Sequence, residues 1–161
     1  MFNYPKKIFL LFLIFNLTFV SNAQAEATFN DINGDGTGFD VSDQDTQPRG
    51  IAFNNDGTKM FIVGDQGNDI NSYTLSTGFD LTTATFNDIN GDGTGFDISG
   101  QETVPRGLTF NDDGTKMFLV GDNGNDINEY TLSVGFDLTS TVTHVGSFDT
   151  VSYTHLRAHE T

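Results

Sequence analysis

The chain contains a long internal duplication. Residues 27–83 recur 57 residues later as residues 84–140, and 45 of the 57 aligned positions are identical. Two copies this similar are expected to adopt the same fold and to pack side by side. We therefore divide the 161 residues into a leader (1–25), a first repeat (26–83), a second repeat (84–140), the start of a third repeat (141–150) and a tail (151–161).

Each repeat consists of short apolar runs separated by turn residues. In the first repeat the runs are Pro48–Phe53, Lys59–Val63 and Asp69–Leu75, and Thr83–Phe86 leads into the second copy. Asn54-Asn55-Asp56-Gly57 has the residue types of a tight hairpin turn. The run Lys59–Val63 predicts a strand covered on both faces, and the alternation in Asp69–Leu75 predicts a half-covered strand. The sequence thus predicts an all-β protein with three or four antiparallel strands per repeat.

Substitutions between the copies indicate which positions are buried. Apolar volume is kept at three pairs, which predicts burial: Val41/Ile98, Ile51/Leu108 and Ile62/Leu119. Polar exchange at three others predicts exposure: Asn55/Asp112, Gln66/Asn123 and Ser72/Glu129. Phenylalanine recurs in both copies and is predicted to fill the core; in the first copy the rings are Phe29, Phe39, Phe53, Phe61 and Phe79.

The segment Pro48–Gly64 and its copy Pro105–Gly121 carry a P-R-G-[IL]-x-F-N-x-D-G-T-K-M-F-x-V-G unit. This unit resembles the repeats of bacterial extracellular β-propellers of the YVTN/lactonase-like type. The resemblance implies propeller blades, although these repeats carry extra residues where one joins the next. About two and a half blades are present, fewer than the four to eight of a closed ring. We therefore expect an incomplete ring, with an unpaired edge strand at each end that favours association.

The extra residues contain a D-x-N-x-D-G motif, which has the alternating oxygen donors of a calcium loop. The candidate ligands are Asp31, Asn33, Asp35, Thr37 and Asp40 in the first copy, and Asp88, Asn90, Asp92, Thr94 and Asp97 in the second. The twelfth loop position is Ser42 or Ser99 in place of the usual acidic ligand. Calcium is the candidate cofactor, and a turn between repeats that needs no metal is the alternative. A second acidic turn, with Asp65, Asp69, Asp122 and Asp126, has either solvated or ligating side chains.

The composition restricts the compartment and the partners. The formal net charge of −15 leaves no basic patch for nucleic acid. Cations are the natural partners of so many carboxylates. The alternative is that the acidic residues serve only to keep the protein soluble. The absence of cysteine excludes disulfides and thiolate chemistry. Residues 1–25 resemble a secretory signal peptide cleaved before Glu26, with an uncleaved anchor as the alternative. The expected location is therefore outside the cell, or the periplasm or cell envelope, without membrane insertion after cleavage.

The last residues depart from the repeat pattern. Thr141–Asp149 reaches a Phe-Asp pair without the D-x-N-x-D-G motif, so any metal is an accessory to the fold. Residues 151–161 resemble a translated sequencing adapter, which implies a longer natural chain; a genuine terminus is the alternative. His155 and His159 lie four residues apart, but the adapter resemblance removes them as site candidates.

Three functions remain open at this point. The first is a noncatalytic propeller segment with a binding or structural role and an unknown protein or glycan ligand, because nearly identical repeats suit scaffold residues better than catalytic ones. The second is a lactonase-like hydrolase fragment, which depends on fold analogy; no catalytic residue is assigned, since His144 is the only histidine outside the tail. The third is a calcium-stiffened adhesin-type array.

Overall fold

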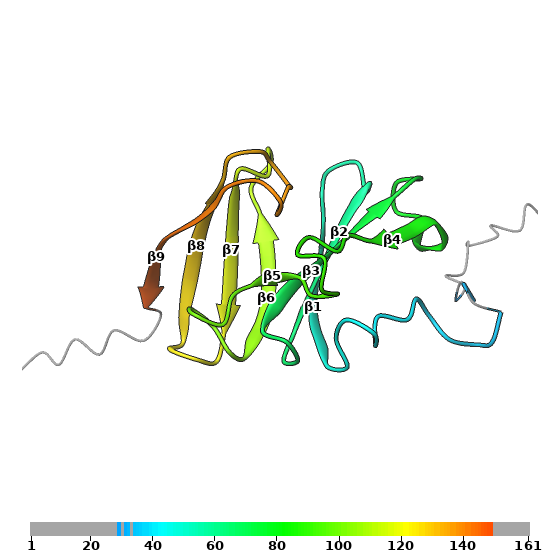
Figure 1. The fold of residues 1–161 in the computed structure, drawn as a ribbon, viewed down its shortest axis with the longest axis horizontal. Coiled ribbons are helices and arrows are strands. Elements are labelled where there is room, and N and C mark those ends of the chain that lie inside the picture. The colour runs from blue at the N-terminus through cyan, green and yellow to red at the C-terminus, as the bar shows by residue number, and fades with distance from the viewer. Residues whose placement is uncertain (1–28, 30, 33, 150–161) are drawn as a thin grey trace, which may run out of the picture.

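The computed structural model describes residues 29, 31, 32 and 34–149, which form two antiparallel β-sheets (Figure 1). Sheet A contains β1 (Pro48–Phe53), β2 (Lys59–Gly64), β3 (Asp69–Leu75), β4 (Ala84–Phe86) and β5 (Phe96–Asp97). Sheet B contains β6 (Pro105–Phe110), β7 (Lys116–Gly121), β8 (Asp126–Leu132) and β9 (Val142–Asp149). A 3-10 turn, η1 (Leu81–Thr83), precedes β4, and the described residues contain no α-helix. The all-β prediction is confirmed. The predicted leader, the ligand Asn33 and the tail lie outside the described residues.

The two repeats form sheets with the same strand register. Ile51 lies opposite Ile62 in sheet A, and the equivalent Leu108 and Leu119 face each other in sheet B. Both sheets have an irregularity in register near the start of the first strand. Each repeat therefore uses its first three strands as one antiparallel unit, in the order in which they occur in the chain.

The predicted hairpin turn joins the first two strands in both sheets. Gly57 and Gly114 have φ values of 72° and 70°, in the left-handed region that glycine adopts without strain. A Cβ on Gly57 would lie 2.4 Å from the ring of Phe79, so a phenylalanine also fills the space beside this turn. The turn thus requires glycine for its backbone conformation and for the close approach of the ring.

The outer edge is where the two sheets differ. In sheet A, β4 pairs with the second half of β3 and β5 with its first half, so the loop between them interrupts one outer strand. In sheet B, β9 runs along the whole of β8 without a loop. Phe96 and Phe148 nevertheless occupy the same register, opposite Ile70 and Ile127. The D-x-N-x-D-G segment is therefore an excursion from the outer edge of sheet A.

The first strands of the sheets lie side by side. Figure 1 shows β1 and β6 next to each other in the middle of the molecule, with β4 and β9 at opposite sides. Gly50 and Gly107 permit this approach, because a Cβ on Gly50 would lie 2.9 Å from the Cα of Gly107. The two sheets thus meet along their first strands and diverge toward their outer strands.

Two hydrophobic clusters stabilise this arrangement. The larger one lies between the sheets and joins Phe61, Val63 and Ile70 of sheet A to Met117, Leu119 and Tyr130 of sheet B, among others. The smaller one covers the opposite face of sheet A and contains Met60, Ile62, Tyr73 and Leu75. As predicted, β2 is covered on both faces.

Several burial predictions are wrong. Ser72 is 6% exposed because its face of β3 lies against sheet B, and its hydroxyl accepts a hydrogen bond from Asn87. The prediction that β3 is half-covered is therefore also wrong. Ile51 is 55% exposed because no sheet covers its side of β1 in the described chain. Phe29 and Phe79 are exposed as well, whereas the prediction of a core position is confirmed for Phe61.

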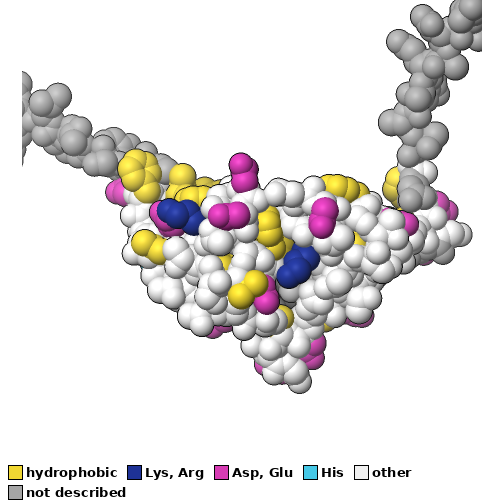
Figure 2. Space-filling model, turned by 90° about the horizontal axis from the view of Figure 1, so that it is seen from above, with side chains coloured by type: hydrophobic (Ala, Val, Ile, Leu, Met, Phe, Trp, Pro, Cys, Tyr) yellow, Lys and Arg dark blue, Asp and Glu magenta, His cyan; other side chains and the backbone are white. Residues whose placement is uncertain are grey.

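Among the described residues, the structure has no helix with the length and hydropathy needed to span a bilayer. The described surface is rich in carboxylates. Figure 2 shows acidic side chains spread over one face, with few basic side chains and scattered apolar patches between them.

Candidate functional site

The D-x-N-x-D-G loop of the second repeat curls around its first carboxylate. Asp88 Oδ1 accepts hydrogen bonds from the backbone N–H groups of Gly91 and Gly93, at 2.7 and 3.1 Å. Both glycines have positive φ, 75° and 82°. Asn90 Nδ2 donates to the carbonyl oxygen of Gly95 at 2.8 Å, which ties the loop to the start of β5. Hydrogen bonds within the segment therefore hold the loop in a compact conformation.

The two glycines of the first repeat have the same backbone conformation, whereas the hydrogen bond to its first carboxylate comes from a different residue. Asp31 Oδ1 accepts from the backbone N–H of Asp35 at 3.1 Å, and Gly34 and Gly36 have φ values of 72° and 82°. Of the described residues between 31 and 38, all except Ile32 are exposed. The sequence copy is therefore reproduced as a structural copy at these glycines.

A threonine fixes the third carboxylate of each loop. Asp35 Oδ1 accepts from the backbone N–H and the hydroxyl of Thr37 at 2.9 and 2.5 Å, and Asp92 makes the same pair with Thr94 at 3.0 and 2.6 Å. The threonine hydroxyl is the main cause that lowers the pKa of Asp35 and Asp92. Both carboxylates are therefore ionised at neutral pH, as a cation ligand has to be.

The predicted ligands Asp40 and Asp97 bond to their own downstream turns. Asp40 accepts from the backbone N–H of Ser42 at 2.9 Å, and Asp97 accepts from that of Ser99 at 2.8 Å. The bond from the Ser42 backbone lowers the pKa of Asp40, and the pKa of Asp97 is lowered first by the Ser99 side chain. In the part of the chain that the structure describes, no three acidic or histidine side chains converge to hold a metal. The structure thus does not gather Asp97 into a three-carboxylate set with the loop.

The second acidic turn has a structural carboxylate. Asp69 is 5% exposed, so the interpretation of this residue as a solvated turn residue is wrong. Its Oδ2 accepts from the backbone N–H of Gly95 at 2.7 Å, and its Oδ1 accepts from Asn71 Nδ2 at 3.0 Å. Desolvation is the main cause that raises the pKa of Asp69. Asp69 therefore anchors the end of the D-x-N-x-D-G loop of the second repeat to the sheet.

Arginine and aspartate alternate across the junction of the two sheets. Arg49 binds Asp65 at 2.7 Å; Arg106 approaches Asp65 at 3.5 Å and also forms an ion pair with Asp122. The arginine follows the proline that opens the first strand, and the aspartate follows the second strand in both copies. Exposed pairs of this kind contribute at most about 1 kcal/mol each. Sequence analysis missed this ladder, although the same Arg–Asp spacing occurs in both copies.

A buried carboxylate at the end of each sheet was also missed. Asp45 is 1% exposed and Glu102 is 0% exposed. One oxygen of Asp45 accepts from the backbone N–H of Gln47 at 2.6 Å, and one oxygen of Glu102 accepts from that of Val104 at 2.6 Å. The second oxygen of each has no hydrogen-bond partner among the described residues. The only sequence signal was the acidic exchange Asp45/Glu102.

Among the described residues, His144 is the only histidine, and its side chain contacts residues of the neighbouring strand β8. Its Nε2 lies 3.0 Å from Asn128 Oδ1, and its ring lies 5.2 Å from that of Tyr130. These contacts hold β9 on β8. No catalytic role is assigned to it.

Comparison with known proteins gives no family model that matches the chain and no curated protein that matches it in sequence. The function therefore has to be argued from the sheets and loops described above.

Proposed function

We propose that the chain is a secreted, acidic β-propeller-type repeat module with a noncatalytic binding or structural role at the bacterial cell envelope. The two sheets are consecutive blades in this proposal. The observation that carries it is the meeting of the sheets along β1 and β6, with their outer strands diverging (Figure 1). Strands of one blade radiate from a central axis in this way.

The identical registers support the same interpretation. Sheets built on one register present the same side chains at the same height, so the contacts between one pair of blades can be repeated for the next. The Arg–Asp ladder has this property, since Asp65 of sheet A binds Arg106 of sheet B. The loops between strands are then free to present a binding surface to a protein or glycan.

Two measurements test the proposal. Sequencing of the gene beyond residue 150 is expected to show further repeats of the same kind, bringing the total to between about four and eight. Mass spectrometry of the exported protein is expected to give a mature chain that begins at Glu26. A stop codon directly after Phe148-Asp149 would contradict the propeller, and retention in the cytoplasm would contradict the location.

We further propose that the D-x-N-x-D-G loops bind calcium weakly. All the available donors are oxygens, which suits a hard cation, and the paired glycines of each loop allow the sharp turn that such sites use. Side chains supply fewer than the six to eight ligands that calcium prefers, so backbone carbonyls and water would complete the shell. We therefore expect an affinity in the range of about 0.1–1 mM.

Thermal melting in calcium tests the loops. At ~5 mM calcium, an occupied site with an affinity near 0.5 mM stabilises the chain by about 1.4 kcal/mol, which raises the Tm by several degrees. The variant Asp92→Asn is expected to lose the response of its loop. Asparagine can still accept the Thr94 hydrogen bonds, so the turn is kept while the charge is removed. Magnesium at the same concentration is the control, and an unchanged Tm in calcium would exclude the site.

A further inference from the structure

A pocket of about 220 Å³ lies at the junction of the two sheets. Lys59 of β2 and Ser72 of β3 line it from sheet A, and residues 136–139, which precede β9, line it from sheet B. Thr74 and Thr139 belong to the lining and are solvent-exposed, so the pocket opens to water. Both walls lie within the described residues, so the pocket is formed without any further repeat. Its volume is below the range of drug-sized ligands, about 300–1,000 Å³, and suits a smaller molecule.

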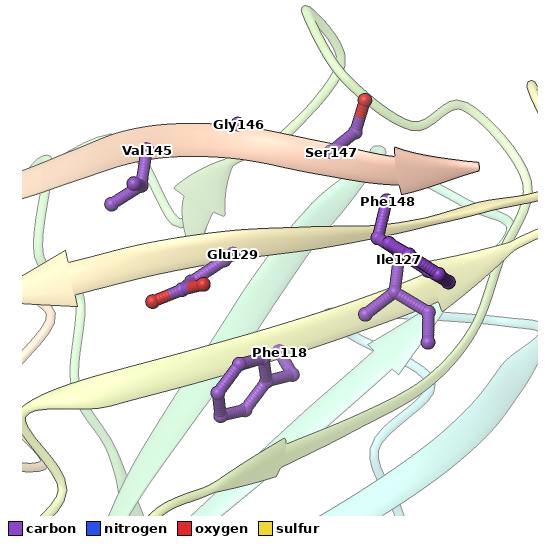
Figure 3. Close-up of a pocket in the computed structure, with 7 residues that line it drawn as sticks. All are labelled: Phe118, Ile127, Glu129, Val145, Gly146, Ser147 and Phe148. Atoms are coloured by element: carbon purple, nitrogen blue, oxygen red, sulfur yellow. The ribbon is translucent and has the colours of Figure 1, made fainter.

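The second repeat has a longer, charged side chain at the position of Ser72. Glu129 lies opposite Phe118 in the register of sheet B, and Ser72 and Phe61 have the same relation in sheet A. Figure 3 shows the Glu129 side chain on β8 next to the ring of Phe118 on β7. Its Oε1 forms an ion pair with Lys116 Nζ at 2.7 Å. The second repeat thus carries its own carboxylate for the lysine that begins its second strand.

The equivalent lysine of the first repeat lacks such a partner. Within the described residues Lys59 forms no ion pair, and its Nζ donates one hydrogen bond, to the carbonyl oxygen of Phe136 at 2.9 Å. An ammonium group has three donors, so two remain. The Ser72 hydroxyl accepts from Asn87 Nδ2 at 3.3 Å and donates to no group of the described chain. The pocket is therefore lined by N–H and O–H donors that have room for an acceptor.

We propose that this pocket binds a small organic carboxylate. The carboxylate of the ligand accepts hydrogen bonds from Lys59 and Ser72, and it has the same relation to Lys59 that the Glu129 carboxylate has to Lys116. Because serine is shorter than glutamate, the space that a glutamate would fill is left open in the first repeat. This inference rests on the proposed binding role of the chain and names a ligand class for it.

The rest of the lining restricts the remainder of the ligand. Phe61 and Leu138 are 1% and 5% exposed and give the pocket an apolar wall. Asp137 Oδ1 accepts from the backbone N–H and the hydroxyl of Thr139, at 2.9 and 2.6 Å. The Thr139 hydroxyl is the main cause that lowers the pKa of Asp137, and the charge of Lys59 acts in the same direction. Asp137 is therefore ionised at neutral pH. It favours a ligand with a hydroxyl or ammonium group and disfavours a second carboxylate.

Titration of the purified full chain with propionate, followed by 1H–15N NMR spectra, tests the proposal. Propionate is the probe because it has the atoms of a glutamate side chain beyond Cα. We expect a Kd of about 1–10 mM, with shifts at the backbone amides that line the pocket. Propionamide lacks the charge and is expected to bind at least about 10-fold more weakly. Equal binding of propionamide, or no saturable shift up to about 50 mM propionate, overturns the proposal.

Two further probes distinguish the sources of the carboxylate. Glucuronate presents it on a sugar with hydroxyl groups, and alanine presents it beside an ammonium group. Whichever binds more tightly than propionate shows whether the pocket takes a sugar acid or an amino acid. Succinate, with its second carboxylate near Asp137, is expected to bind more weakly than propionate.

Variants test which residues hold the carboxylate. Ser72→Glu supplies it from within the chain, as Glu129 does in the second repeat, and is expected to abolish propionate binding. Lys59→Gln removes the charge but keeps a donor, and is expected to weaken binding at least about 10-fold. The control Thr103→Glu adds a charge at an exposed residue just before β6, at the end of sheet B away from residues 136–139, and is expected to bind normally.

Circular dichroism and thermal melting check that each variant is folded. If Ser72→Glu does not fold, Lys59→Gln decides the question. Unchanged propionate binding in either folded variant shows that the carboxylate lies elsewhere, and the proposal is then wrong. These results do not bear on the number of repeats in the gene or on export of the chain, so the proposed function is tested separately.

Discussion

Gly64 ends β2 at a point where a buried carboxylate fills the space of a side chain. A Cβ on Gly64 would lie 2.2 Å from Asp45 Oδ2 and 2.4 Å from the carbonyl oxygen of Gln47. In sheet B, Gly121 and Glu102 have the same relation, at 2.2 Å. Glycine at this position is therefore required by packing, since its φ is not positive.

The variant Gly64→Ala is expected to lower the free energy of unfolding by about 1–3 kcal/mol, because the methyl group overpacks the site. Urea unfolding followed by circular dichroism measures the change. Gly100→Ala is the matched control, because a Cβ there meets nothing within 4 Å. Equal stability of the two variants would show that Asp45 is not held against this strand.

Two buried tyrosines are expected to lower the free energy of unfolding as the pH rises above 10. Burial, with nearby carboxylates as the second cause, raises the pKa of Tyr73 and Tyr130 from 10.0 to about 12. The unfolded chain therefore loses these protons first as the pH rises. The contribution of each buried, protonated tyrosine to the free energy of unfolding is on the order of 2–3 kcal/mol. This contribution is fully present below pH 10 and is lost as the pH rises through about 12.

Absorbance titration of tyrosinate in the folded chain checks this prediction, in parallel with urea midpoints at each pH. Tyr73→Phe is expected to remove one late-ionising group and to reduce the loss of stability above pH 10. It also removes the hydrogen bond from the Tyr73 hydroxyl to Gln44, so its stability is compared with the wild type at neutral pH as well. Ionisation of both side chains near pH 10 would contradict the burial.

Among the secondary-structure elements, the outer strand shows how a repeat tolerates a change of length. β4 and β5 flank nine residues, Asn87–Gly95, whereas in β9 three residues, Val145–Ser147, cover the same interval between equivalent positions. Both arrangements end with phenylalanine and aspartate opposite the start of the third strand. The loop is thus separable from the sheet that carries it.

Replacing Asn87–Gly95 with Val-Gly-Ser is expected to preserve the β-sheet circular dichroism spectrum. The free energy of unfolding is expected to fall by about 1.5–3 kcal/mol, because Asp69 loses the N–H of Gly95. Any calcium-dependent shift of the second loop is expected to disappear, while that of the first loop remains. A chain that fails to fold would show that the loop is required for the sheet.

Elements with local causes were predictable from the sequence. The strand Lys59–Gly64 follows from its apolar run, and the preceding turn follows from Gly57. Whether a face of a strand is buried depends on which sheet packs against it, and the sequence of one repeat does not contain that information. The burial of Ser72 and the exposure of Ile51 were therefore predicted wrongly. The ladder of arginine and aspartate was likewise not predictable, because it depends on how two copies are placed in space.

At the scale of the whole molecule, each sheet is stabilised by its neighbour. Sheet B buries one face of sheet A, and nothing in the described chain covers the equivalent face of sheet B. In repeat architectures of this kind, stability is approximately a sum of terms for single repeats and for their interfaces. Equivalent residues in the two copies should therefore have unequal effects on stability.

Val63 and Val120 give a matched comparison, because they occupy the same register and are 0% and 43% exposed. Val63→Asp buries an unpaired carboxylate between the sheets and is expected to cost more than about 4 kcal/mol or to prevent folding. Val120→Asp is expected to change the stability of the dilute chain by less than about 1 kcal/mol, since its carboxylate stays in water. Urea midpoints measured at low protein concentration separate this effect from any association. Equal losses would mean that both faces are covered within one chain, and a repeat stack with an open end would then be the wrong description of this molecule.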